Sequence, residues 1–147
     1  MFSLKIKMEF FKIFKINRVP LYSASKNNHV DVVKFLLSVK GTDVNAVDNS
    51  NYSSLHMASA AGHSDVVKAL LESPYINVNM KFGKNVTALY LAAQNGHLEV
   101  VKLLVNFPKT KINERNSVGA SAADAAKQFK HDDCYKVIMS HGGRCYL

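Results

Sequence analysis

The chain has 147 residues, 48% of them hydrophobic, and a formal net charge of +8. This composition is enough for one domain with a buried core and excludes a disordered tail. No apolar run reaches the roughly 18 residues of a membrane-spanning helix, and lysines interrupt every apolar stretch near the N-terminus, so we expect neither a membrane span nor a secretory signal. The two cysteines, Cys134 and Cys145, form no C-x-x-C pair. We therefore expect a reducing compartment, the cytoplasm or alternatively the nucleus, and no zinc or thiol redox chemistry.

Residues 1–18 form a basic, aromatic arm, and half of the excess positive charge lies in the first 20 residues. Its apolar side chains fit two patterns. One is the alternation of a strand, with Phe2, Leu4, Ile6, Met8 and Phe10 on one face; the other is a helix face made by Phe2, Ile6, Phe10, Ile13 and Phe14. We expect the arm to cap the units that follow or to fray, and a helix on an anionic membrane surface is the alternative.

From residue 19 onward the chain repeats itself every 34 residues. The units begin at Val19, Ser53, Thr87 and Ser121. The sixth residue of each unit is alanine and the eleventh is histidine: Ala24, Ala58, Ala92 and Ala126, and His29, His63, His97 and His131. The sixteenth residue is lysine: Lys34, Lys68, Lys102 and Lys136. So many coincident positions, without an insertion or deletion, predict four copies of one structural unit.

Each unit predicts two short helices. Ser53, Thr87 and Ser121 are suited to cap a first helix of about eight residues, and Pro20 suits a first helical position. A residue that tolerates a positive φ then ends this helix, as Gly62 does. A second helix follows, with an acidic residue in its first turn, an apolar stripe and the lysine on its wet side. Before each new cap stands a turn residue, Asn17, Asn51, Asn85 or Gly119, where we expect a positive φ.

These units resemble the ankyrin repeat, whose period is near 33 residues and whose opening motif is T-P-L-H-x-A. The openings here are V-P-L-Y-S-A, S-S-L-H-M-A, T-A-L-Y-L-A and S-A-A-D-A-A. The resemblance implies an all-α fold, an ankyrin-type helix-turn-helix solenoid with short β-hairpin loops, over residues 19–143, with 144–147 as a tail. The extra residue of each unit falls between the second helix and the hairpin, in S-V-K-G-T-D-V-N, E-S-P-Y-I-N-V-N and N-F-P-K-T-K-I-N.

The sequence departs from the family pattern at two places. The histidine of the opening motif occurs only as His56, while Tyr22, Tyr90 and Asp124 replace it, so we expect the family's hydroxyl–imidazole hydrogen bond in one unit only. The fourth unit is more polar than the others, which suits the end of an array.

The sequence offers little support for a metal-binding or catalytic motif. The four histidines recur once per unit, so we expect them on the order of 10 Å apart, too far to share one zinc ion, and their expected role is hydrogen bonding around the turn between helices. Neither a glycine-rich phosphate loop nor a G-x-S-x-G motif occurs. We therefore expect no enzyme, cofactor, metal or small-molecule substrate. Nucleic-acid binding is the weaker expectation for the basic charge, because the lysines are spread one per unit.

The resemblance implies that the chain binds a protein partner, whose identity the residues do not reveal. By the family's geometry, the contacts come from hairpin tips and from the exposed side of the first helices. The tip positions are Asn49, Ser50, Tyr52, Gly83, Lys84, Val86, Ser117, Val118 and Ala120, and the helix positions are Lys26, Asn27, Ala60, Ala61, Gln94, Asn95, Gln128 and Phe129. Tyr52 and Phe129 are the expected anchors, as exposed aromatics. The resemblance also implies Asn45 as a candidate for hydroxylation.

Overall fold

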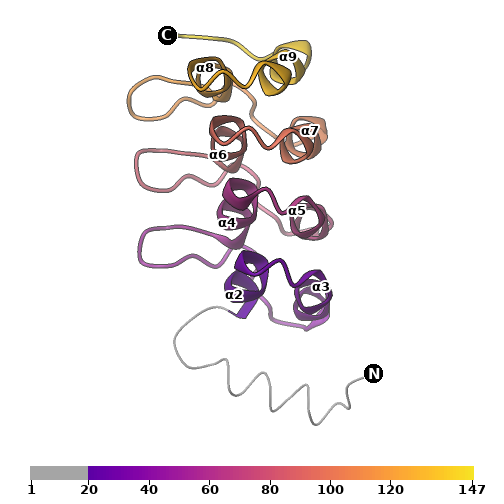
Figure 1. The fold of residues 1–147 in the computed structure, drawn as a ribbon. Helices are drawn as coiled ribbons and strands as arrows, with labels where there is room; N and C mark the ends of the chain where they lie inside the picture. The colour runs from indigo at the N-terminus through magenta and orange to yellow at the C-terminus, as the bar shows by residue number, and fades with distance from the viewer. Residues whose placement is uncertain (1–19) are drawn as a thin grey trace.

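The computed structural model describes residues 20–147, which form eight helices arranged in successive pairs. The pairs are α2 (Pro20–Lys26) with α3 (Val30–Ser38), α4 (Ser54–Ala61) with α5 (Ser64–Leu71), α6 (Ala88–Gln94) with α7 (Leu98–Asn106), and α8 (Ala122–Gln128) with α9 (Asp132–Ser140). Figure 1 shows the first helices stacked in one row and the second helices in another. The predicted all-α solenoid is therefore confirmed. In this part of the chain no helix has the length and apolar character to cross a membrane.

The first helices begin and end where local chemistry predicts. The hydroxyls of Ser53, Thr87 and Ser121 each accept a hydrogen bond from the backbone N–H three residues later, and α2 begins at Pro20. Positive φ angles follow the helices at four equivalent positions: Asn28, Gly62, Gly96 and Lys130. At Gly62 and Gly96 the chain also needs the absence of a side chain, because a Cβ would lie 2.5 Å from the histidine ring of the next unit.

The core is a continuous layer between the two rows of helices. First helices contact the neighbouring first helices, and second helices contact the neighbouring second helices. The alanines Ala58, Ala92 and Ala126 are completely buried, which lets adjacent first helices approach closely. Leu70 and Leu104 are equally buried on the second helices, and such a side chain stabilises the fold by about 1.5–3 kcal/mol.

The loops between units project away from the row of second helices (Figure 1). Two of them carry a single antiparallel bridge, Val47 with Ser53 and Phe82 with Val86, and no longer strand occurs among residues 20–147. The predicted hairpins are thus reduced to one bridge or to turn hydrogen bonds. Asn51, Asn85 and Gly119 have the expected positive φ.

The last residues of the chain lie against the fourth unit. The Ser121 hydroxyl donates to the Arg144 carbonyl oxygen at 2.6 Å, and the backbone N–H groups of Tyr146 and Leu147 donate to the Asp124 carboxylate at 3.0–3.1 Å. The segment 144–147 is therefore attached to the start of α8. The predictions for the arm, residues 1–18, fall outside the described residues, as does Asn17.

Candidate protein-binding surface

The tip residues of the three loops are mostly exposed. Asn49, Ser50, Gly83, Lys84, Ser117 and Val118 are exposed, Val86 is half-buried, and Ala120 is buried. Ala120 is therefore wrong as a contact residue, because its side chain packs inward just before the cap of α8. Side-chain acceptors shape two tips: Asp48 Oδ1 accepts from the backbone N–H groups of Ser50 and Tyr52, and Asn116 Oδ1 accepts from those of Val118 and Ala120.

The helix positions form a second row at the C-terminal ends of the first helices. Lys26, Asn27, Ala61, Asn95, Gln128 and Phe129 are exposed, whereas Ala60 and Gln94 are half-buried. A helix of seven or eight residues is about 10–12 Å long, so this row and the loops next to the helix N-termini lie at opposite ends of the same helices. The predicted surface is thus two exposed rows with the first helices between them.

Tyr52 is not an exposed anchor, and this prediction is wrong. Its ring is half-buried, lies edge-on to Phe82 at 4.5 Å between ring centroids, stacks on His56 at 5.5 Å and lies edge-on to Tyr22 at 6.4 Å. Burial, with smaller contributions from Tyr22 and Asp48, raises the pKa of Tyr52 to about 12. Tyr52 therefore joins the first two loops to the first helices. Phe129, in contrast, is 45% exposed as predicted.

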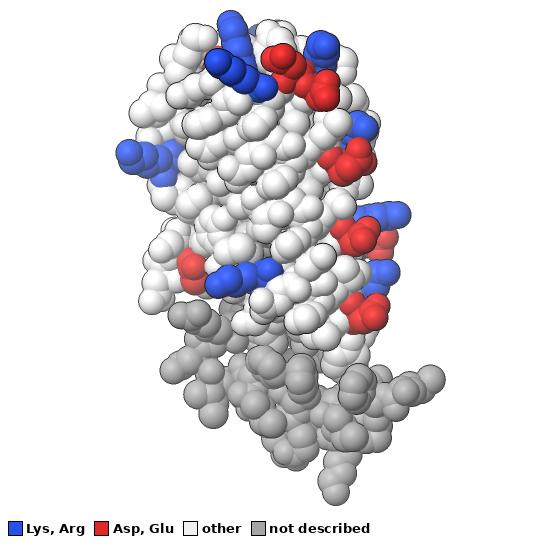
Figure 2. Space-filling view, in the orientation of Figure 1, with Lys and Arg blue, Asp and Glu red and all other residues white. Residues whose placement is uncertain are grey.

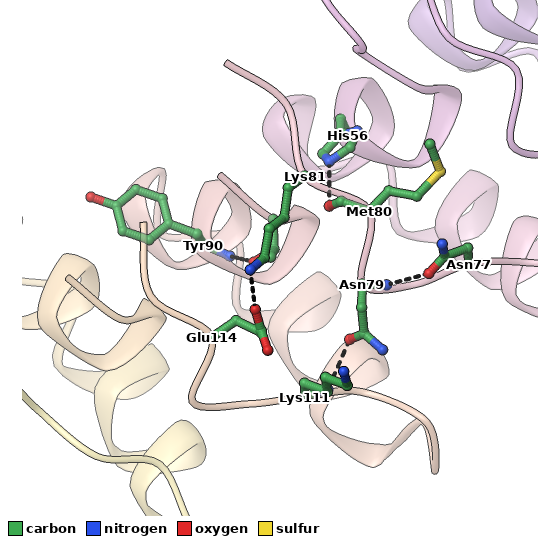
Figure 3. Close-up of polar contacts among 9 residues, drawn as sticks. His56, Asn77, Asn79, Met80, Lys81, Tyr90, Lys111 and Glu114 are labelled. Carbon is green, nitrogen blue, oxygen red and sulfur yellow. Dashed lines mark hydrogen bonds and ion pairs between the residues drawn. The ribbon is translucent and has the colours of Figure 1, made fainter. Parts of the chain in front are cut away.

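His56 makes the hydrogen bonds that its position in the opening motif predicts. Its Nδ1 lies 2.9 Å from the Ser53 hydroxyl and accepts from the Ser53 backbone N–H, and its Nε2 lies 3.0 Å from the Met80 carbonyl oxygen (Figure 3). Burial lowers the pKa of His56, against the effect of the carbonyl groups of Met80 and Val86 and of Asp48. The neutral ring thus joins the start of α4 to the next loop.

Asp124 occupies the equivalent position in the fourth unit. Its Oδ2 accepts from the Ser121 backbone N–H at 2.8 Å, as His56 accepts from Ser53. Burial would raise the pKa of Asp124, but hydrogen bonds from the backbone N–H groups of Ser121, Leu147 and Tyr146 and from the Ser121 hydroxyl lower it. The carboxylate therefore binds the chain end where His56 binds a loop.

The repeated histidines form hydrogen bonds near the turns between helices, as expected, and these bonds join successive units. The Nε2 atoms of His63, His97 and His131 lie 2.8–3.1 Å from the carbonyl oxygens of Lys26, Ala60 and Gln94 in the preceding first helices. Each ring is used in a contact between units. Among residues 20–147, no three His, Cys, Asp or Glu side chains come together in a group that could hold a metal ion.

A second series of contacts runs along the loops through repeated asparagines. Asn45 Nδ2 donates to the Tyr75 carbonyl, and its Oδ1 accepts from the Asn77 N–H. Asn79 makes the same two bonds with Lys109 and Lys111, and Figure 3 shows the one with Lys111. All four distances are 2.7–2.8 Å. Hydroxylation of Asn45 stays a prediction, for which the measurement is one added oxygen in the intact mass of the protein from cells.

The first helices carry few charged side chains: Lys26 on α2, and Asp124 and Lys127 on α8. Figure 2 shows blue and red atoms along one edge, over the second helices, while the middle of this face carries few charges. Each second helix has an acidic residue three positions before its lysine, and Glu99 and Lys102 form an ion pair at 3.1 Å. Lys81 and Glu114 form another ion pair between neighbouring loops (Figure 3). Of the fifteen candidate residues other than Gly83 and Ala120, only Lys26 and Lys84 are charged.

Tyr75 is an exposed aromatic residue that the sequence reasoning missed. It is 80% exposed and lies in the loop after α5. Its side chain was not singled out because the repeat alignment gives no aromatic at the equivalent positions, Gly41 and Lys109. The available signal was the Pro74-Tyr75 pair in the loop that carries the extra residue.

Comparison with known families agrees with the fold. A profile described as ankyrin repeats (three copies) matches residues 8–82 and 76–146. The chain therefore belongs to the ankyrin repeat family, whose members are in general protein–protein interaction modules without enzymatic activity. The first match begins at residue 8, inside the arm. No curated protein matches the chain.

Proposed function

We propose that this chain is a non-catalytic module that holds a protein partner across the loop tips and the exposed ends of the first helices. The observation that carries the proposal is the presence of one large exposed apolar side chain in each row. Val118 is 66% exposed at the third tip, and Phe129 is 45% exposed at the end of α8. Around them lie exposed amide and hydroxyl side chains, among them Ser117 and Gln128. Apolar anchors within a polar rim are typical of protein–protein interfaces.

The chemistry of the two rows favours a partner surface without strong charge. Most candidate side chains are amides, hydroxyls or small apolar groups, and the amides and hydroxyls can hydrogen-bond a partner's backbone and polar side chains. Salt screens interactions between exposed charges, so binding through these rows should change little with ionic strength. The lysines of the second helices lie beside acidic residues, which does not make the continuous basic surface that nucleic acid requires.

Affinity purification with matched variants tests the proposal. The full chain and its Val118→Ser, Phe129→Ser double variant are used as baits, and captured proteins are quantified by mass spectrometry. We expect the double variant to lose the specific partner by about tenfold or more, because each apolar anchor contributes about 1–2 kcal/mol or more to binding.

Met139→Ser is the control. Met139 is 38% exposed but lies on α9, the second helix of the fourth unit, which belongs to neither row. It should capture the same proteins as the unmodified chain. Equal recovery by all three baits, or an equal loss with Met139→Ser, would refute the proposed surface.

A further inference from the structure

A separate pair of grooves lies on the side of the second helices. The larger, of about 700 Å³, lies between α3 and α5 and the loops that follow them, with an apolar lining that includes Leu37, Val39, Ala69 and Pro74. One unit further, a groove of about 370 Å³ lies between α5 and α7, next to Leu71, Leu103 and Phe107. The two grooves share Glu72 and lie one unit apart.

The walls of these grooves are built by the loops in which this chain is longer than its family. A 34-residue unit has one residue more than the usual 33, and that residue falls between the second helix and the hairpin. The larger groove is lined by the corresponding residues, from Val39 to Thr42 in the first unit and from Ser73 to Tyr75 in the second. The lining of the larger groove therefore includes the segment that carries the extra residue of each unit.

Tyr75 stands at the edge of the larger groove on a backbone that is held in place. Its carbonyl oxygen accepts from Asn45 Nδ2 at 2.7 Å, and the N–H of Ile76 donates to the Ser73 carbonyl at 3.2 Å. Ile76 is buried, while the Tyr75 ring is 80% exposed. On a backbone that is already held, tyrosine has only two side-chain torsions to order on binding, and it is among the residues that contribute most to interfaces.

The charges of the two grooves differ. Lys34 and Lys40 line the larger groove and form no ion pair with any residue from 20 to 147, and Glu72 is its only acidic lining residue. In the smaller groove, Lys68 and Lys102 face Glu72 and Glu99, and Lys102 already pairs with Glu99. The larger groove therefore has a positive excess that complements a carboxylate.

We propose that the groove between α3 and α5 binds a short acidic peptide segment of a protein partner. A large apolar side chain of the segment lies on the groove floor beside Tyr75, and an aspartate or glutamate reaches Lys34 or Lys40. This surface is on the second helices and shares no residue with the loop-tip and helix-end rows, so it stands or falls independently of the function proposed above.

A phage-displayed library of random peptides, selected on the folded full chain, is the probe. Enriched peptides are synthesised, and their affinities are measured by fluorescence anisotropy for the unmodified chain, Tyr75→Ser, the Lys34→Glu, Lys40→Glu double variant, and Phe129→Ser. We expect a class of peptides that combines a large apolar residue with Asp or Glu. Tyr75→Ser and the lysine double variant should each weaken its binding by about tenfold or more.

Phe129→Ser should leave the affinity of this class of peptides within about twofold of that for the unmodified chain, because Phe129 lies in the helix-end row and not in the groove. Circular dichroism checks that each variant is folded, and all four substitutions in the three variants replace exposed side chains. The proposal is overturned if no peptide is enriched, if the enriched peptides are basic or uncharged, or if their binding is insensitive to Tyr75→Ser.

Discussion

Two serines of α4, Ser54 and Ser59, are completely buried, and their hydroxyl oxygens have no hydrogen-bond partner in the described part of the chain. The equivalent residues of α6 are Ala88 and Ala93, which are as deeply buried. Because alanine already fits this environment in the next unit, the serine hydroxyls add a desolvation cost without a compensating bond.

Ser59→Ala should therefore raise the free energy of unfolding by about 1 kcal/mol, since it removes an unpaired hydroxyl and leaves almost no cavity. Urea denaturation followed by circular dichroism measures the change. Ser53→Ala is the control in the opposite direction, because it removes the cap of α4 and should cost about 1 kcal/mol. A loss of stability in both variants would show that the Ser59 hydroxyl is satisfied in solution.

The asparagine contacts between loops offer an internal comparison. Asn79 bonds the following loop through both the oxygen and the nitrogen of its side-chain amide. Asn113 donates to the Gly142 carbonyl, and its Oδ1 has no partner among residues 20–147. Asn79→Ala should lower the free energy of unfolding by about 1–3 kcal/mol, and Asn113→Ala should lower it by clearly less. Equal losses in chemical denaturation would mean that these bonds do not contribute in proportion to their number.

At the scale of the helix, the same cap is built from different chemical groups. Ser53 with His56 and Ser121 with Asp124 both form a reciprocal cap, while Thr87 accepts from the Tyr90 N–H without a return bond. A neutral imidazole and a carboxylate respond differently to pH. We therefore expect the cap of α4, rather than the cap of α8, to respond to pH near neutrality.

The pKa of His56 is lowered by burial from its usual 6.5, so the unfolded chain binds more protons than the folded chain at mildly acidic pH. The stability that this pKa shift contributes is fully present above about pH 6.5. It is lost as the pH falls below about 6.5 toward the lowered pKa of His56. Asp124 also has a lowered pKa, but its contribution is lost only below about pH 3.8.

Thermal unfolding between about pH 7.5 and pH 5 should therefore show a fall in midpoint that is smaller in His56→Tyr, a residue found at this position in two other units. The same pH dependence in both proteins would exclude His56 as its source.

At the scale of the whole molecule, the main helix contacts among residues 20–147 lie within a unit or between neighbouring units. α6 lies between α4 and α8, and α7 lies between α5 and α9. Stability in such an array is the sum of unit and interface contributions, so damage to an interior unit also removes the interfaces on both sides.

Leu89→Ala tests this, because Leu89 of α6 is 4% exposed and interior. We expect a loss of about 2–5 kcal/mol, the usual cost of truncating a buried leucine. Amide hydrogen exchange should show faster exchange in α4 and α8 as well as in α6, whereas Val118→Ser should leave exchange unchanged. Faster exchange confined to α6 and α7 would contradict the neighbour coupling.

The sequence by itself determined the fold class, the helix starts and the positive-φ turns. Ser53, Thr87 and Ser121 cap helices, and Asn51, Asn85 and Gly119 turn the chain, because each depends only on residues within about four positions. The 34-residue period then fixed which apolar positions face the core.

Only the tertiary structure decided which side chains are available to a partner. Tyr52 precedes a cap and is half-buried because Phe82 of the next loop and Tyr22 of α2 cover it, 30 residues away in either direction. Tyr75 is exposed because Asn45, also 30 residues away, holds its backbone while the next loop leaves its ring in solvent. Exposure depends on the neighbouring units in space, and a repeat pattern assigns the same environment to every unit.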